Sequence, residues 1–199
     1  MSTRIIVPHR GLEHAKTRLA GVLEPAERSA VAERLLRHVL EAAVGTGHEV
    51  VVISPEAALE ELVVANGARL AVQHGLGLNS GLREARTEAI EDGVTVLAVI
   101  HGDLPELTRE DMAALIDAVG GAGRTVAIAP DALEAGTNGL AQSPPDVIAF
   151  QFGVGSFAAH RGSAIRAGAH AVVIERPGLA FDVDTPADLA AWVARGFAA

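Results

Sequence analysis

The chain has 199 residues, of which 49% are hydrophobic, 21% charged and 3% aromatic; its net charge is −9 and it contains no cysteine. This composition is typical of one globular domain over residues 1–199, and it excludes disulfides and thiolate sites. No apolar run approaches the roughly 18 residues of a membrane span and no basic block is present. We therefore expect a soluble cytoplasmic protein that binds neither membranes nor nucleic acid.

Short aliphatic runs alternate with amphipathic stretches over the first 130 residues. In chain order we predict strand 4–8, helix 25–44, strand 49–54, helix 55–67, strand 68–73, helix 79–93, strand 94–100, helix 108–121 and strand 124–130. The run 94–100 is the most continuously apolar, so we expect it to be the central strand. Thr108, with Asp111 three residues later, predicts a capping box at the start of its helix.

The alternation stops between residues 131 and 155, which we interpret as a loop-rich functional insertion inside the domain. Helix 156–169, strand 170–175 and helix 185–196 follow, the last with Thr185 as N-cap and Pro186 at its first position. The whole pattern predicts an α/β fold with a mixed, mostly parallel central sheet flanked by helices.

The loop after the first strand gathers basic side chains: His9, Arg10, Lys16 and Arg18. Lys16 is the only lysine, whereas the other basic residues are arginine. A compact ammonium suits a phosphate ligand, and codon bias in an arginine-rich chain also explains a single lysine. A basic loop before a helix N-terminus can hold nucleotide phosphates, although the P-loop pattern is absent and a solvated basic loop is the alternative.

Acidic residues follow two extended segments. Asp103 stands directly after the most apolar run, in Gly-Asp-Leu-Pro, and it is either a turn residue or a ligand for a divalent cation. Asp182 and Asp184 alternate in Phe-Asp-Val-Asp, so in β geometry both side chains share one face, where a cation would relieve their repulsion. Spacing does not decide whether both of them bind a metal, and capping of the last helix is the alternative for Asp184.

In their order and spacing, the motifs PHRGLEHAKTRLAG, GLGLNSG, GDLPEL, GTNGL, FGVGSFAAH and FDVDTPADL resemble the 2-phospho-L-lactate guanylyltransferase family along essentially the whole chain. The resemblance implies a nucleotide-diphospho-sugar transferase-like, Rossmann-like fold and a role in coenzyme F-420 biosynthesis. It also implies Mg²⁺-dependent transfer of GMP from GTP to the phosphate of phosphoenolpyruvate or 2-phospho-L-lactate, with release of pyrophosphate. The alternatives are transfer to 3-phosphoglycerate, transfer to a sugar phosphate, and a non-catalytic GTP-binding module.

The resemblance also implies a role for individual residues. Those implied for GTP are Pro8, Lys16, Arg18, Gly77 and Asn79, and those implied for catalysis are Lys16, Arg18 and Asp103. The implied Mg²⁺ ligands are Asp103, Asp182 and Asp184. The residues implied for the small phosphorylated three-carbon acid are Thr137, Asn138, Gly153, Gly155 and Ser156.

Several positions keep two interpretations. His9 stands where the family often has lysine, so the charge of that loop near neutral pH depends on an imidazole. His160 lies one helical turn beyond Ser156 and is either a ligand of the acceptor or a packed histidine. Trp192 and Phe197 belong to internal packing or to a contact surface, which leaves a homodimer as one expectation.

Overall fold

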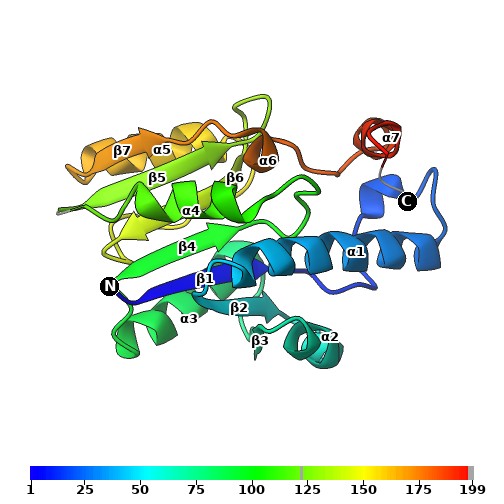
Figure 1. Cartoon of the computed structure of the whole chain (residues 1–199), viewed down its shortest axis with the longest axis horizontal. Helices are drawn as coiled ribbons and strands as arrows, with labels where there is room; N and C mark the ends of the chain where they lie inside the picture. The colour runs from blue at the N-terminus through cyan, green and yellow to red at the C-terminus, as the bar shows by residue number, and fades with distance from the viewer. Residues whose placement is uncertain (122, 197–199) are drawn as a thin grey trace.

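A computed structural model of the chain describes residues 1–121 and 123–196. Its centre is a seven-stranded sheet with the strand order β3-β2-β1-β4-β6-β5-β7 (Figure 1). The strands are β1 (Thr3–Pro8), β2 (Glu49–Ser54), β3 (Arg69–Val72), β4 (Val96–Ile100), β5 (Thr125–Pro130), β6 (Thr137–Ser143) and β7 (His170–Val173). Both pairings of β6 are antiparallel and the other strand pairs are parallel, which confirms the mixed, mostly parallel sheet.

Helices cover both faces of the sheet. They are α1 (Pro25–Val44), α2 (Glu60–Ala65), α3 (Leu78–Glu91), α4 (Arg109–Asp117), α5 (Ser156–Arg166), α6 (Pro177–Ala180) and α7 (Pro186–Ala194), with short 3₁₀ turns η1 (Thr17–Leu19) and η2 (Ala57–Leu59). In Figure 1, α1 and α4 lie in front of the sheet and α3 and α5 behind it. Alternation along β1 explains these two layers, because Ile5 packs in the core with α1 and α4 and its neighbour Ile6 packs in the core with α3 and α5.

The aliphatic runs predicted most of these elements. The helix predicted at 25–44 is confirmed as α1, and the most apolar run is β4, the fourth of the seven strands. The capping box predicted at Thr108 and the N-cap predicted at Thr185 are confirmed, since both side chains accept a hydrogen bond from the third backbone N–H of their helix, α4 or α7. Local sequence was sufficient at these places because the interactions that form them are local.

The prediction of a loop-rich insertion at 131–155 is wrong, because β6 lies inside it and pairs with β4 and β5. The strand escaped detection because its sequence, TNGLAQS, carries buried polar residues where an aliphatic run is expected: Thr137, Asn138 and Gln142. The side chains of Thr137 and Asn138 bond to residues far along the chain, His160 and Leu179, and Gln142 Oε1 accepts from the Ile148 N–H; no local pattern shows these contacts.

Two other differences are smaller. The helix predicted at 55–67 is the 3₁₀ turn η2 followed by the short α2, and the four-residue α6 was not predicted. Trp192 is buried and packs with Leu19 and Leu35, so it belongs to the core, whereas Phe197 lies outside the described residues. Among the helices in the described ranges, none is long and apolar enough to cross a membrane.

Candidate functional site

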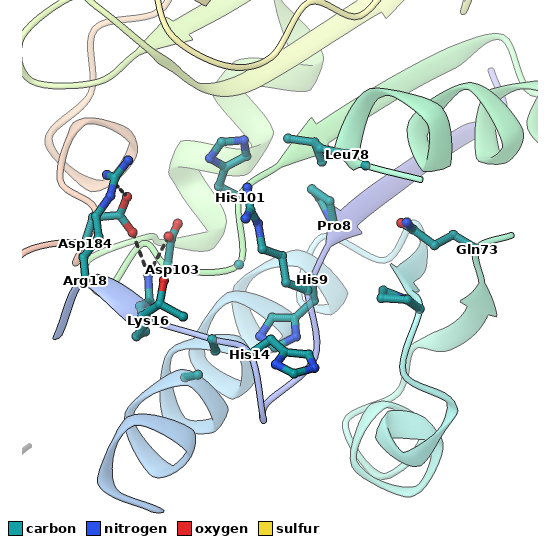
Figure 2. Close-up of a pocket in the computed structure, with 17 residues that line it drawn as sticks. Pro8, His9, His14, Lys16, Arg18, Gln73, Leu78, His101, Asp103 and Asp184 are labelled. Atoms are coloured by element: carbon teal, nitrogen blue, oxygen red, sulfur yellow. Dashed lines mark hydrogen bonds and ion pairs between the residues drawn. The ribbon is translucent and has the colours of Figure 1, made fainter. Parts of the chain in front are cut away.

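A cavity of about 490 Å³ opens at the carboxyl ends of β1 and β4, where α/β sheets commonly bind ligands. Pro8 and His9 reach it from the end of β1, and His101 and Asp103 from the segment after β4. Lys16 and Arg18 enter from the loop before α1, and Asp184 from the segment before α7. Figure 2 shows these side chains around one cavity, with Asp103 and Asp184 near Lys16 and with Gln73 and Leu78 on the other side.

The three predicted acids meet at one end of this cavity, where Asp103 and Asp184 belong to its lining and Asp182 lies beside them, outside the lining. Asp103, Asp182 and Asp184 each offer a carboxylate oxygen within 4.8 Å of the others. The two acidic segments are joined by their backbones, because the Val183 N–H donates to the Asp103 carbonyl at 3.2 Å. The alternative capping roles are taken by other side chains, since Thr108 and Thr185 cap α4 and α7.

The only lysine lies against these acids. The Lys16 ammonium donates to Asp103 Oδ2 at 2.7 Å and to Asp184 Oδ1 at 3.1 Å, and its side chain is only 8% exposed. Arg18 donates to the other oxygen of Asp184 at 3.1 Å, but its side chain is 71% exposed. Lys16 has φ 50°, in the left-handed region that non-glycine residues seldom adopt. The only lysine of the chain is thus the counter-charge of two carboxylates.

The pKa values of Asp103 and Asp182 are shifted in opposite directions. Burial opposes the charged forms of both Lys16 and Asp103, yet their mutual attraction raises the pKa of Lys16 and lowers that of Asp103. Burial, together with the charges of Asp103 and Asp184, raises the pKa of Asp182 to about 6. One carboxyl of the cluster is therefore left without a sufficient counter-charge.

The cluster has the chemistry that a divalent cation requires. Its donors are carboxylate oxygens, which Mg²⁺ prefers. Asp103 Oδ1 is buried and has no hydrogen-bond partner among the described residues, so an acceptor remains available there. Burial is the main cause of the raised pKa of Asp182, and the charges of Asp103 and Asp184, which add to it, are charges that a cation would offset. These three residues fit a hard divalent ion.

The opposite end of the cavity is formed by residues suited to a nucleoside. Pro8, Pro55, Gln73, Gly77 and Leu78 line it. Gly77 has φ 84°, so the turn into α3 needs a residue without Cβ strain. The side chains at this end are less polar than those at the acidic end, which suits the flat face of a base.

Asn79 lies outside the cavity lining, although the resemblance implies a contact with GTP. Its side-chain amide donates to the Phe152 carbonyl at 2.9 Å and accepts from the Phe152 N–H at 3.0 Å. This pair of bonds ties the start of α3 to the segment before α5. Asn79 therefore connects the end of the cavity at Gly77 and Leu78 with the segment expected to bind the acceptor.

The residues expected to bind the acceptor also lie beyond the cavity lining. Thr137 and Asn138 come from β6, Gly153 and Gly155 lie directly before α5, and Ser156 is the first residue of α5. Gly155 precedes α5 with φ 73°, and the first turn of this helix has backbone N–H groups that suit an anion.

His160 is a packed histidine in the described structure. Its side chain is completely buried, and Nε2 accepts from the Gln151 N–H at 2.9 Å. The proton is therefore on Nδ1, which lies 3.1 Å from the Thr137 hydroxyl. Burial, followed by the charge of His101, lowers the pKa of His160 to about 4, so it is neutral near pH 7. Its contacts orient Thr137 and the segment that carries Gln151.

His9 and His101 are among the histidines that line the cavity. Burial lowers the pKa of His9 to about 4, so the loop gains no charge there near pH 7, and His9 Nδ1 accepts from the Gly11 N–H. Sequence reasoning missed His101, which lines the cavity, packs 5.3 Å from the Phe152 ring and has a buried Nε2 without a partner among the described residues. Its position two residues before Asp103, at a strand end, was the available signal.

Comparisons with known proteins agree along the chain. Residues 3–197 match a family model described as "Guanylyl transferase CofC like". Phosphoenolpyruvate guanylyltransferases of Rubrobacter xylanophilus and Sphaerobacter thermophilus are both 42% identical, over 98% and 95% of this chain and 96% and 91% of their own length. A 3-phospho-D-glycerate guanylyltransferase of Phenylobacterium zucineum is 35% identical over 96% of this chain and 89% of its own length.

Solved structures share the fold. A candidate nucleotide-diphospho-sugar transferase from Desulfovibrio desulfuricans G20 superposes with a TM-score of 0.79 at 20% identity, covering 95% of this chain and 85% of the other. A nucleotidyl transferase from Methanothermobacter gives a TM-score of 0.69 at 18% identity, covering 98% and 97%. The expected fold is confirmed by these superpositions.

Proposed function

The chain belongs to the CofC-like guanylyl transferase family and is a guanylyltransferase of coenzyme F-420 biosynthesis, and on this premise we propose that its acceptor is phosphoenolpyruvate. The support is that two relatives at 42% identity carry this acceptor in their names, whereas the relative named for 3-phospho-D-glycerate is 35% identical. An unsaturated acid and a hydroxylated one differ by few contacts, so the acceptor itself has to be measured.

The proposed reaction joins two phosphates. An oxygen of the acceptor phosphate attacks the α-phosphorus of GTP, the bond to the β-phosphate oxygen breaks, and pyrophosphate leaves. A phosphate monoester has a second pKa near 6, so the attacking group is already a dianion near neutral pH and no general base is needed. The protein has to overcome repulsion between two polyanions and to align them, which is work for positioning and electrostatics.

The cavity suits a GTP molecule that lies with its base near Gly77 and Leu78 and its phosphates near Lys16 and Arg18. The supporting observation is that the cationic loop and the less polar end belong to one cavity. Pro8 lies between them at the end of β1. Asn79 acts in this proposal by holding the start of α3 against Phe152.

Asp103, Asp182 and Asp184 would hold Mg²⁺. When bound, this ion supplies positive charge that offsets the charge of the phosphate oxygens. We propose that the Lys16 ammonium, which is paired with Asp103 and Asp184, is also the group that would bind the triphosphate of GTP. A compact ammonium on a flexible stem would reach the phosphates from its position beside the acids.

The acceptor is proposed to bind where Thr137, Gly153, Gly155 and Ser156 come together. The support is the helix start at Ser156 and the Thr137 hydroxyl held by His160. Backbone N–H groups and a neutral hydroxyl can bind a carboxylate and a phosphate without adding a charged side chain.

The observation that carries the proposal is the convergence of three acids and the only lysine at one end of a cavity of nucleotide size. The test is to supply GTP, Mg²⁺ and phosphoenolpyruvate, 2-phospho-L-lactate and 3-phosphoglycerate in competition, with pyrophosphate release and product mass as readouts. We expect the guanylylated phosphoenolpyruvate to dominate. A dominant product from another acid, or pyrophosphate release with a sugar phosphate alone, overturns the proposed acceptor. GTP binding without pyrophosphate release identifies a non-catalytic module.

A further inference from the structure

Asn138 connects the two segments that carry the acids. It lies in β6, next to β4, and is 4% exposed. Its backbone carbonyl accepts from the His101 N–H at 3.0 Å, two residues before Asp103. Its side-chain amide donates to the carbonyls of Leu179 and Ala180, at 3.0 and 3.3 Å. The same amide nitrogen lies 3.4 Å from Asp182 Oδ1.

We infer that Asn138 is a positioning residue for Asp182, and through Asp182 for the three-acid cluster, instead of a ligand of the acceptor. The inference deepens the proposed function and rests on it for the role of the acids. Three contacts carry it: the backbone bond to His101, the amide bonds to the segment 179–180, and the amide contact with Asp182.

The donor inventory excludes a simple acceptor-binding role. An asparagine side chain has two N–H donors, and both belong to the same nitrogen, Nδ2. In Asn138 this nitrogen faces the segment 179–182. Asn138 also does not line the cavity described above. An acceptor phosphate or carboxylate would need these same donors, so it would have to break the bonds that hold α6 in place.

Asp182 needs such a partner more than the other acids do. Asp103 and Asp184 are held by Lys16, and Asp184 also by Arg18. The Asp182 carboxylate has Asn138 as its side-chain hydrogen-bond donor among the described residues. A neutral donor orients a carboxylate without competing with a cation for its charge, as is common for the groups that support metal ligands.

The position also explains why an amide is present. Aspartate has the same shape, but its ionised form cannot donate to the Leu179 and Ala180 carbonyls and would add a fourth negative charge beside Asp182. Alanine would leave the buried Leu179 carbonyl without this donor and Asp182 without its orienting contact, whereas the Ala180 carbonyl would keep the Ala132 N–H. Both substitutions of Asn138, by aspartate and by alanine, would therefore disturb the three-acid cluster by altering the contact with Asp182.

The test is a double-mutant cycle of Asn138→Ala and Asp182→Asn, read out by Mn²⁺ titration with paramagnetic resonance. Titrations are made on the protein alone and with the non-transferable analogue in which methylene replaces the α,β-bridging oxygen of GTP. We expect Asn138→Ala to weaken Mn²⁺ binding about tenfold, the lower end of what supporting groups contribute. In the Asp182→Asn background the same change should alter Mn²⁺ binding by less than about twofold, because the two residues act as one unit.

Steady-state kinetics separate this role from acceptor binding. If Asn138 positions Asp182, the KM for the acceptor stays within about twofold and the Mn²⁺ dependence of turnover shifts in proportion to binding. A raised acceptor KM with unchanged Mn²⁺ binding overturns the inference, and so do independent effects of the two substitutions on Mn²⁺. Absence of Mn²⁺ binding to the wild-type protein, with and without the analogue, overturns it as well.

Gln142→Ala is the matched control, because Gln142 is a buried amide on the same strand that binds the Ile148 N–H away from the acids. It should lower thermal stability and leave Mn²⁺ binding unchanged. If Asn138→Ala does not fold, Asn138→Leu keeps a similar side-chain volume, removes the amide donors without adding a charge, and gives the same comparison. Because Mn²⁺ binding needs no turnover, failure of the proposed acceptor leaves this test intact, and coupling between Asn138 and Asp182 can be established for any acceptor.

Discussion

Replacing Lys16 with methionine tests the assignment of this residue as the internal counter-cation. Methionine keeps an unbranched side chain and removes the ammonium that lies 2.7 Å from Asp103 and 3.1 Å from Asp184. Removing one partner of a buried ion pair costs about 3–5 kcal/mol, because a buried charge is left without compensation. Lys16 is 8% exposed, but Asp103 is 23% and Asp184 40% exposed, so solvent reduces the loss to about 3 kcal/mol.

For a chain of this size, each kcal/mol corresponds to about 2–4 °C in Tm, so Lys16→Met should lower Tm by about 6–12 °C. Mg²⁺ should reverse part of this loss without nucleotide, because the freed carboxylates can bind it directly. At ten times its Kd a ligand stabilises by about 1.4 kcal/mol, which is about 3–6 °C. The same Mg²⁺ concentration should shift the wild-type Tm less, since the ion has to displace the ammonium.

Thermal unfolding followed by circular dichroism, with and without Mg²⁺, measures both effects. Arg18→Met is the matched control, because Arg18 lies in the same loop, is 71% exposed, and has Asp184 as its one ion-pair partner within residues 1–121 and 123–196. Such an exposed pair contributes at most about 1 kcal/mol. Unchanged stability of Lys16→Met, or an Mg²⁺ shift no larger than in wild type, would refute the reasoning.

Three further outcomes follow from the site. Asp103→Asn should lower turnover at least about 100-fold and change the free energy of unfolding by less than about 2 kcal/mol. A smaller loss of turnover, measured as pyrophosphate release, would show that Asp103 takes no part in the reaction. Lys16→Arg should lower kcat/KM at least about tenfold although the charge is kept, because a planar guanidinium does not fit the space between Asp103 and Asp184; equal activity contradicts this. His160 has a folded-state pKa of about 4, below the value near 6.5 of an unfolded chain, so its contribution to stability is present above pH 6.5 and is lost as pH falls towards 4. Urea unfolding should therefore show that wild type loses about 2 kcal/mol more than His160→Gln between about pH 7 and pH 5, and parallel profiles would exclude His160 as the cause.

Much of the fold could be predicted because its determinants are local. The strand at 49–54 and the helix at 25–44 are an aliphatic run and an amphipathic repeat, and the structure has them at these bounds. β6 could not be predicted in the same way, since the buried side chains of Thr137 and Asn138 have their hydrogen-bond partners on distant segments, at His160 and Leu179. A strand whose buried polar groups are satisfied by other segments has no local signature.

The sequence by itself determined which residues are available for chemistry: the acids after extended segments, the single lysine in a basic loop, and the glycine-rich start of a helix. Only the tertiary structure decided what each of them contacts. Lys16 pairs with residues 87 and 168 positions away, and Asn138 joins segments that flank it in space but not along the chain. The physical reason is that the order of strands in the sheet sets which loops share an edge, and short-range patterns do not encode that order.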